Sequence, residues 1–342
     1  MKIGIFADSS LGRAAGLLEK IGPMGGVRCD FFDMGLHPPD EVSLDQSALY
    51  WNGRDLTGLD IAYIHGFSFM NPVVPSPGRE RDWSLWQSDY LVEQQKYSFL
   101  FSMFKELERR GVTLVNPPEA HVRSFMKPSF LEHLRRSGFS VPKLLCSNDM
   151  RSVKTFCAEN EITLWRPSAG RAAWQLFLDR QRTHLIKRDA PPVLLSEGIE
   201  GPLVRGYFFD KKPLLMLKFN PPHRTPPERL EQFFHVDHPE AAEELGRLGE
   251  VIGAKWFLVF FILKDNRPWI YDIDPDPILD GLPDFYREHL MRHLACSLAG
   301  TQEECPLPEG ADPPLDRPVF FLRRMLQILF DLEKSKYDDK KK

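Results

Sequence analysis

Over its first 115 residues the chain alternates short apolar segments with amphipathic ones, and this alternation restricts the fold more than any other feature. The amphipathic segments indicate helices, two of which end at Gly22 and Gly111. Strands separated by helices form a parallel sheet covered on both faces. We therefore expect residues 1–115 to form a Rossmann-like N-terminal domain. The segments predicted to be strands are 2–8, 27–34, 59–66 and 112–118.

The composition indicates a globular intracellular protein. Of 342 residues, 42% are hydrophobic and 27% are charged, which suffices for two or three small domains. A net charge of -4 argues against nucleic-acid binding, which usually needs a basic face. The five cysteines show no CxxC spacing, as expected of reduced thiols in the cytoplasm. We see no signal peptide and no run of about 20 apolar residues, so we predict no membrane segment.

The rest of the chain indicates a mixed α/β (α+β) architecture. A helix over 119–138 and another over 149–160 precede two hairpins, which turn at 210–212 and 264–267. Residues 67–90 are rich in Pro, Ser and Trp and are predicted to form a long loop. The last segment, 301–342, is expected to hold an apolar helix over 316–335 and a frayed tail.

The motif "WIYDIDPDP" places aspartates at every second position at the end of a predicted strand. Asp272 and Asp274 therefore face the same side of that strand. Two neighbouring carboxylates repel each other unless a cation, an arginine or water lies between them. The spacing thus predicts a charged partner. The alternative is a polar strand end at which Asp274 or Asp276 caps a turn.

Five motifs, taken in order, resemble the ATP-grasp superfamily, and most closely its ribosomal-protein glutamate ligase and glutathione synthetase branch. They are "LVNPPEAHVRSFMKPSFLEHLRRSGFSVPKLL", "LWRPSAG", "LLSEGIEGPLVRGYFF", "LLMLKFNPPHR" and "FLVFFILKDNRPWIYDIDPDP". The resemblance implies a Rossmann-like pre-ATP-grasp layer followed by a two-subdomain ATP-grasp fold. It implies an ATP-grasp domain over 116–300, with a lid subdomain over about 140–196 and a C-terminal subdomain over about 197–300.

The same resemblance implies a set of ATP-binding residues. Lys127 and Arg166 occupy the positions whose cations contact the nucleotide phosphates. A hinge strand reads the adenine with its backbone groups, and an acid beyond it holds the ribose. Three residues match the hinge and a fourth matches the ribose acid: Glu197, Gly198, Ile199 and Glu200. A solvated helix lysine at position 127 and an edge strand with a surface acid remain the simpler alternatives.

The resemblance also implies catalytic and metal-binding positions. Arg205 and Lys218 match basic residues that face the reacting phosphate or acyl group. Asp272 and Asp274 match the family's metal pair, so Mg²⁺ or Mn²⁺ is expected there. The chain departs from the family pattern at Phe260, where an acid is usual, at Arg166, where a lysine is usual, and in the glycine-poor loop that follows.

These residues lead to three alternatives for the function. The first is an ATP- and Mg²⁺-dependent carboxylate–amine ligase that acts through an acyl-phosphate on a small-molecule or peptide substrate. The second is an ATP-grasp regulatory or binding protein that binds nucleotide but has weakened catalysis. The third is a structural partner protein that assembles through the helix over 316–335. The sequence leaves the substrates and the oligomeric state open, a homo-oligomer included.

Overall fold

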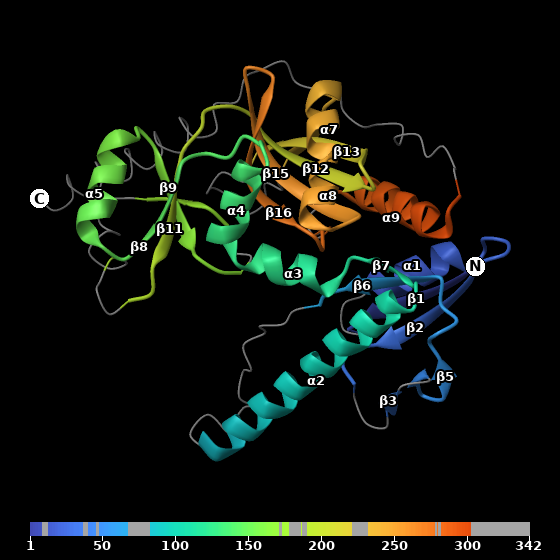
Figure 1. The fold of residues 1–342 in the computed structure, drawn as a ribbon. Helices are drawn as coiled ribbons and strands as arrows, with labels where there is room; N and C mark the ends of the chain where they lie inside the picture. The colour runs from blue at the N-terminus through green and yellow to red at the C-terminus, as the bar shows by residue number, and fades with distance from the viewer. Residues whose placement is uncertain are drawn as a thin grey trace, which may run out of the picture. The chain divides into compact units, whose positions relative to one another are not determined.

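The computed structural model describes most of the chain as two compact units, whose elements are labelled in Figure 1. The first unit comprises residues 1–122, 252–256 and 283–301, and the second 123–251 and 257–282. None of the helices among the described residues is long and apolar enough to cross a membrane. The described residues are 1–8, 13–36, 40–45, 48–67, 83–170, 173–177, 186, 190–220, 232–277, 279 and 282–301.

Two predicted segments lie outside the described residues. They are 68–82, which is most of the predicted loop, and 302–342, which includes the predicted C-terminal helix and tail.

The first unit is built on a parallel sheet of four strands in the order β2-β1-β6-β7. Each of the three neighbouring pairs is parallel, which confirms the sheet predicted from the alternation of strands and helices. The strands are β1 (Lys2–Ala7), β2 (Arg28–Asp33), β6 (Ile61–His65) and β7 (Thr113–Val115).

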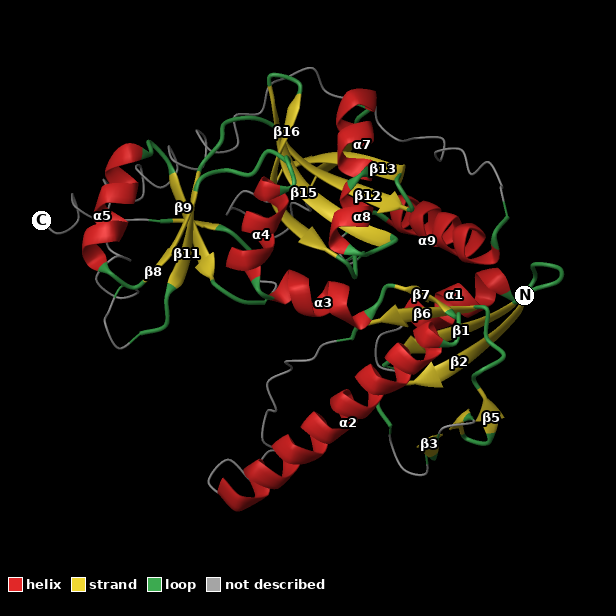
Figure 2. Cartoon of the chain, in the orientation of Figure 1, coloured by secondary structure: helices red, strands yellow, loops and turns green. Residues whose placement is uncertain are grey.

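Helices α1 (Arg13–Ile21), α2 (Trp83–Arg109) and α9 (Asp284–Ala299) belong to this unit. Helix α1 packs against α9, and Lys20 forms an ion pair with Glu288 between them. Helix α2 begins at Trp83, so the loop predicted for residues 67–90 ends earlier than the sequence indicates. The long red helix α2 is plain in Figure 2.

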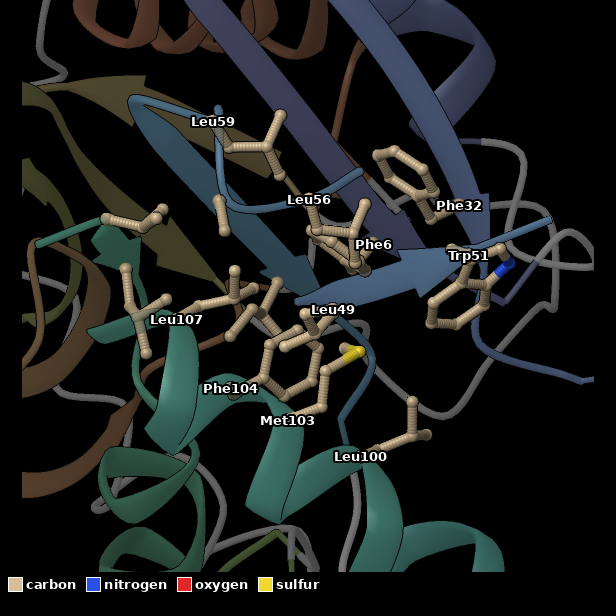
Figure 3. Packing of buried hydrophobic residues seen from close by; sticks show 14 of the residues in the cluster. Phe6, Phe32, Leu49, Trp51, Leu56, Leu59, Leu100, Met103, Phe104 and Leu107 are labelled. Carbon is tan, nitrogen blue, oxygen red and sulfur yellow. The ribbon is translucent and has the colours of Figure 1, made fainter. Parts of the chain in front are cut away.

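One face of helix α2 packs into the hydrophobic core of the first unit, as Figure 3 shows. Its buried residues recur three or four positions apart, so they line one side of the helix. They meet aromatic rings from the sheet, and the Phe104 ring contacts the Phe6 ring edge to face at 5.2 Å. The buried α2 residues are Leu100, Met103, Phe104 and Leu107.

A small antiparallel sheet, β3-β4-β5, closes part of this core and was not predicted. Its tight turn lies at Asn52 and Gly53, both of which have positive φ angles of 49° and 71°. Asn-Gly is the strongest two-residue hairpin signal, so this turn is predictable from the sequence. The strands are β3 (Val42–Leu44), β4 (Leu49–Trp51) and β5 (Arg54–Asp55).

The buried Asn116 side chain binds residues 252–256 into the first unit. Its Oδ1 accepts hydrogen bonds from the backbone N–H groups of Lys255 at 2.8 Å and Trp256 at 2.9 Å, and its Nδ2 donates to the Trp256 carbonyl. The sequence predicts a continuous domain over 116–300. In the structure, this segment and α9 group with the N-terminal residues instead.

The second unit contains the predicted lid, an antiparallel sheet in the order β10-β9-β11-β8. Helix α5 (Met150–Glu159) begins at Asp149, whose side chain accepts a hydrogen bond from Ser152 N at 2.9 Å. Val153 and Phe156 of this helix pack onto the sheet. The strands are β8 (Leu144–Ser147), β9 (Thr163–Pro167), β10 (Gln175–Leu176) and β11 (Val193–Glu197).

The other sheet of this unit has the order β14-β13-β12-β15-β16 and contains both predicted hairpins. Positive φ angles at Asp210 and Lys211, and at Asp265 and Asn266, form the two tight turns. Helices α7 (Pro239–Gly246) and α8 (Leu248–Ile252) follow this sheet's third strand in the chain. The strands are β12 (Leu203–Phe209), β13 (Lys212–Asn220), β14 (Gln232–His235), β15 (Trp256–Lys264) and β16 (Arg267–Asp274).

Candidate functional site

Lys127 is placed by a break in the helix predicted over 119–138. Helix α3 (Pro118–Phe125) ends before Met126, which is non-helical and forms a β-bridge with Ala169, and α4 (Lys127–Arg136) begins after it. Pro128 suits the first turn of α4 because no backbone N–H is needed there. The Lys127 side chain is 3% exposed. An exposed helix lysine, the simpler alternative, is therefore excluded.

Arg166 is the fully buried cation of strand β9. Its Nη2 donates a hydrogen bond to the Gly170 carbonyl at 2.7 Å. Gly170 has a φ of +80°, a left-handed conformation that favours glycine and turns the loop back towards Arg166. The guanidinium lies over the Trp174 ring, 5.5 Å from its centroid. The Arg166 Nε is buried and has no hydrogen-bond acceptor among the described residues.

Both cations converge on the carboxylate of Asp272. Lys127 Nζ lies 2.5 Å from Oδ1, and Arg166 Nη1 lies 2.5 Å from Oδ2. Burial by itself raises the pKa of Asp272, but the positive charges of Lys127 and Arg166 outweigh it, so the pKa lies below its ordinary value. The charged partner that the aspartate spacing predicts is therefore present, as a pair of cations from two other elements.

A β-bulge in the β15–β16 hairpin determines which side chains surround Asp272. Phe260 lies opposite Asp272, whereas Phe261 lies opposite Ile270, so Tyr271 is the extra residue. Phe260, the position at which the resemblance predicts a further acid, is thus the cross-strand neighbour of Asp272. The Arg205 guanidinium lies over the Phe260 ring, 5.5 Å from its centroid.

The two predicted catalytic cations do not share a face of this sheet. Arg205 pairs with Leu217, and Lys218 pairs with Val204 on the neighbouring register position. Because adjacent residues of a strand point to opposite faces, Arg205 and Lys218 face opposite ways. The contact of Arg205 with the Phe260 ring, which pairs with Asp272, places Arg205 on the face that carries Asp272. Lys218 therefore lies on the other face.

The predicted hinge, residues 197–199 at the end of β11, lies close to strand β9, and Gly198 has no room there for a side chain. Gly198 N donates to the Ile162 carbonyl at 2.8 Å, and a Cβ at Gly198 would lie 2.4 Å from Ile162 Cγ2. The Glu197 carboxylate accepts a hydrogen bond from Lys143 N at 3.3 Å. Glu200, the predicted ribose acid, is exposed.

Tyr271 binds the hinge backbone with its hydroxyl group. It accepts a hydrogen bond from Ile199 N at 2.6 Å and donates one to the Glu197 carbonyl at 2.9 Å. Burial raises the pKa of Tyr271 well above its ordinary value, so the hydroxyl stays protonated. No sequence motif predicts a role for Tyr271, since a bulge in β16 brings it to the hinge. Trp174 donates to the Tyr271 carbonyl at 3.1 Å.

The predicted metal-binding positions, Asp272 and Asp274, already have partners within the protein. Asp274 Oδ1 accepts a hydrogen bond from Asp276 N at 3.0 Å, which is the turn-capping role named as the alternative. No group of three His, Cys, Asp or Glu side chains among the described residues is arranged to hold a metal ion. Mg²⁺ is usually held by one or two carboxylates together with substrate phosphates. Asp272 and Asp274 fit that kind of site, and they do not form an all-protein cage.

The groups at the predicted ATP-binding positions have the chemistry that a nucleotide requires. The buried Arg166 Nε offers a hydrogen bond to an anion such as a phosphate. At the hinge, the Glu197 carbonyl accepts and the Ile199 N–H donates, two positions apart along the backbone. This acceptor and donor are complementary to the N6 amino group and N1 of adenine.

No protein-family model and no curated protein sequence matches the chain. Solved structures do. The ATP-grasp ligase PsnB complexed with a minimal precursor superimposes with a TM-score of 0.74 at 18% identity, covering 87% of this chain and 98% of that one. The macrocyclase MdnC from Microcystis aeruginosa MRC, bound with the precursor peptide MdnA, has a TM-score of 0.71 at 16% identity, covering 88% and 100%.

A RimK domain protein from Sphaerobacter thermophilus DSM 20745 is less similar, with a TM-score of 0.55 at 13% identity, covering 88% of this chain and 100% of that one. PsnB has also been solved with precursor, Mg and ADP, and that structure has a TM-score of 0.73 at 19% identity, covering 87% and 96%. The branch within the superfamily stays a prediction. The fold that these structures share with this chain is the ATP-grasp fold.

Proposed function

We propose that this protein is an ATP-dependent carboxylate–amine ligase that acts on a peptide through an acyl-phosphate. The observation that carries the proposal is the convergence of two buried cations, Lys127 and Arg166, on Asp272 at the end of β16. Burying three charges together is costly unless further charges or hydrogen bonds compensate for the lost hydration. A triphosphate bound beside them would provide this compensation, since it offers negative oxygens to both cations.

The reaction would proceed in two displacements. A carboxylate oxygen of the substrate attacks the γ-phosphorus of ATP, and ADP leaves. The amine nitrogen then attacks the acyl carbon, inorganic phosphate leaves, and the amine proton passes to water. Catalysis of this kind depends on positioning and on stabilising developing negative charge. Lys127 and Arg166 would neutralise phosphate oxygens, and Arg205 would hold the acyl-phosphate from the same face of the sheet.

Asp272 and Asp274 would hold the magnesium ion. When bound, Mg²⁺ or Mn²⁺ would neutralise negative charge on the phosphates. Asp272 would then exchange its two protein cations for the metal, while Lys127 and Arg166 take the phosphates. Every buried charge keeps an opposite partner throughout this exchange, so the cost of an uncompensated charge is avoided.

The proposal of a peptide substrate is supported by the similar structures. PsnB and MdnC are each bound to a precursor or precursor peptide, and both cover most of this chain in the superposition. We infer that the carboxylate and the amine belong to side chains or termini of a peptide. Small-molecule partners remain the alternative.

A second candidate function is nucleotide binding with weakened catalysis. It is favoured by Phe260, which lies opposite Asp272 and supplies no metal ligand. A site with fewer oxygen ligands holds Mg²⁺ more weakly, and weaker metal binding slows phosphoryl transfer. The two candidates share the fold and the ATP site, and differ only in turnover.

Calorimetric titration with ATP, with and without MgCl₂, tests the shared part. The wild type should bind ATP, and Arg166→Met should bind it at least tenfold more weakly, which corresponds to about 1.4 kcal/mol. Arg135→Met is the matched control, because Arg135 is an exposed arginine that pairs with Glu132. A folded wild-type protein without any ATP affinity contradicts both candidates.

Mass spectrometry of peptides incubated with the protein and Mg·ATP tests turnover. A peptide library that combines Asp or Glu with Lys should yield products that have lost one water molecule, together with ADP. ATP binding without such products, for any peptide or small amine and acid pair, would favour the second candidate.

A further inference from the structure

The hydroxyl group of Tyr271 bonds two backbone groups of the hinge, and one of them, the Glu197 carbonyl, also accepts a hydrogen bond from Ser196 Oγ at 3.0 Å. Ile199 N donates to it at 2.6 Å, and it donates to the Glu197 carbonyl at 2.9 Å. Nothing in the proposed reaction uses this side chain, yet it is 4% exposed and makes the hinge's two bonds at once. A tyrosine held in this way has either a bracing role or a role in recognition.

The environment of Tyr271 joins the two sheets of the second unit. Its ring packs at 6.1 Å from the Trp174 ring, edge to face, in a cluster of apolar residues. The cluster includes residues of the lid strands, of the hinge and of the C-terminal sheet. Its buried members besides Tyr271 are Ile162, Leu164, Leu176, Ile199 and Ile262. Such apolar surroundings suit a flat aromatic group, and here the phenol ring is that group.

The polarity of the tyrosine bonds equals that of an adenine edge. Adenine donates from its N6 amino group and accepts at N1, so it satisfies a carbonyl and an N–H in the same sense as the Tyr271 hydroxyl does. Hypoxanthine carries an acceptor at position 6 and a donor at N1, so its polarity is reversed. The Glu197 carbonyl and the Ile199 N–H therefore can be satisfied by the tyrosine or by adenine, but not by both.

Asp272, the residue that follows Tyr271, likewise bonds groups that the proposed function assigns to the nucleotide, here to its phosphates. Asp272 satisfies Lys127 and Arg166, the two cations that the proposed function assigns to phosphates. The bulge in β16 brings these two consecutive residues into contact with the hinge and with the cations respectively. One short segment of the chain thus satisfies both the base-reading and the phosphate-binding groups.

We propose that Tyr271 is a specificity-determining residue whose hydroxyl competes with the adenine edge for the Glu197 carbonyl and the Ile199 N–H. This inference rests on the proposed function, because it assumes that the hinge reads a nucleotide base. Adenine replaces the two tyrosine bonds with two bonds of the same sense, whereas a base of reversed polarity can bond neither backbone group, so the tyrosine keeps both bonds when such a base binds. The competition therefore lowers the affinity for adenine nucleotides and leaves the affinity for a base of reversed polarity unchanged.

Tyr271→Phe tests the inference, because it removes the hydroxyl and retains the ring. The Ile199 N–H then loses its partner, and the Glu197 carbonyl keeps the bond from Ser196 Oγ, so ATP gains two bonds without breaking those of Tyr271. Since two hydrogen bonds of ordinary net strength correspond to roughly a tenfold change in an equilibrium constant, we expect the Kd for ATP to fall about tenfold. The Kd for ITP should change less than about twofold, since its edge cannot satisfy either group.

The same variant should have a lower Tm without nucleotide and a larger rise in Tm on adding ATP. Both changes follow from the two hydrogen bonds that the hinge loses with the hydroxyl and that ATP then replaces. Tyr286→Phe is the matched control, because Tyr286 is a buried tyrosine of α9 in the first unit, 1% exposed. Its removal should leave both nucleotide affinities unchanged.

The outcomes separate the two proposals. If the wild type and Tyr271→Phe both fail to bind ATP, the proposed function fails and this inference fails with it. If the wild type binds ATP and Tyr271→Phe binds it equally or more weakly, Tyr271 is a structural brace of the hinge and only this inference is overturned. An equal gain for ATP and ITP overturns it as well, since that result reflects a more open site and no exchange of hydrogen bonds.

Discussion

Phe260 lies directly opposite Asp272 in the β15–β16 hairpin, so the carboxylate that receives Lys127 and Arg166 has an aromatic ring as its cross-strand neighbour. Cross-strand neighbours in an antiparallel pair lie about 4.5–5.5 Å apart at Cβ, close enough to share a ligand. The same ring supports the Arg205 guanidinium at 5.5 Å. The side chain at position 260 therefore lies beside Asp272 and contacts Arg205.

Phe260→Glu should increase the affinity for Mg²⁺ in the presence of ADP, by about tenfold, because it adds a carboxylate beside Asp272. Phe260→Leu is the control that removes the ring without adding oxygen. Calorimetric titration of MgCl₂ into the ADP complex measures the effect. Equal Mg²⁺ affinities in the two variants would show that residue 260 does not reach the metal.

Asp272→Ala should strongly destabilise the second unit. The substitution leaves Lys127 and Arg166 buried without a counter-charge, and breaking a buried ion pair in this way costs about 3–5 kcal/mol. The loss should appear as a lower urea midpoint. Glu132→Ala removes a carboxylate that also pairs with two arginines, but on an exposed surface, and should change the midpoint little. Similar losses in both variants would argue against a buried network.

Stability should fall in acid partly through Asp272. Its folded-state pKa is lowered by Lys127 and Arg166, against the opposing effect of burial. A lowered pKa contributes stability above the pH at which an unfolded aspartate titrates, near about 4, and that contribution is lost as the pH falls through the folded-state pKa. Asp272→Asn should therefore be less stable than the wild type at pH 7, and the difference in Tm should shrink below about pH 4. Parallel Tm curves for the two proteins would contradict this assignment.

Gly198→Ala should lower both Tm and ATP affinity. The added Cβ would lie 2.4 Å from Ile162 Cγ2 and 2.7 Å from Ile162 Cβ, so the hinge or strand β9 must move, at a cost of about 1–3 kcal/mol. Gly25→Ala is the control, because nothing lies within 4 Å of a Cβ at Gly25. Thermal unfolding and ATP titration of the two variants measure the effect. A tolerated alanine at position 198 would mean that the hinge has room to move.

Local patterns sufficed for much of the secondary structure. The alternation of strands and helices predicted the parallel sheet, and the turn residues Asp210 and Asp265 marked both hairpins. These features depend on neighbours within a few positions, where backbone preference and hydrophobic period act directly. The Asn52-Gly53 turn depends on equally local preferences.

The sequence by itself determined the fold class and the need of Asp272 for a charged partner, because these follow from local pattern and from like-charge repulsion. The order of the ATP-grasp elements followed from the resemblance to that superfamily. Only the tertiary structure decided which partners meet. Lys127 and Arg166 stand 145 and 106 positions from Asp272, and a single bulge in β16 brings Tyr271 to the hinge. Contacts at such separations depend on strand register and on packing between elements, and no local preference of the chain encodes them.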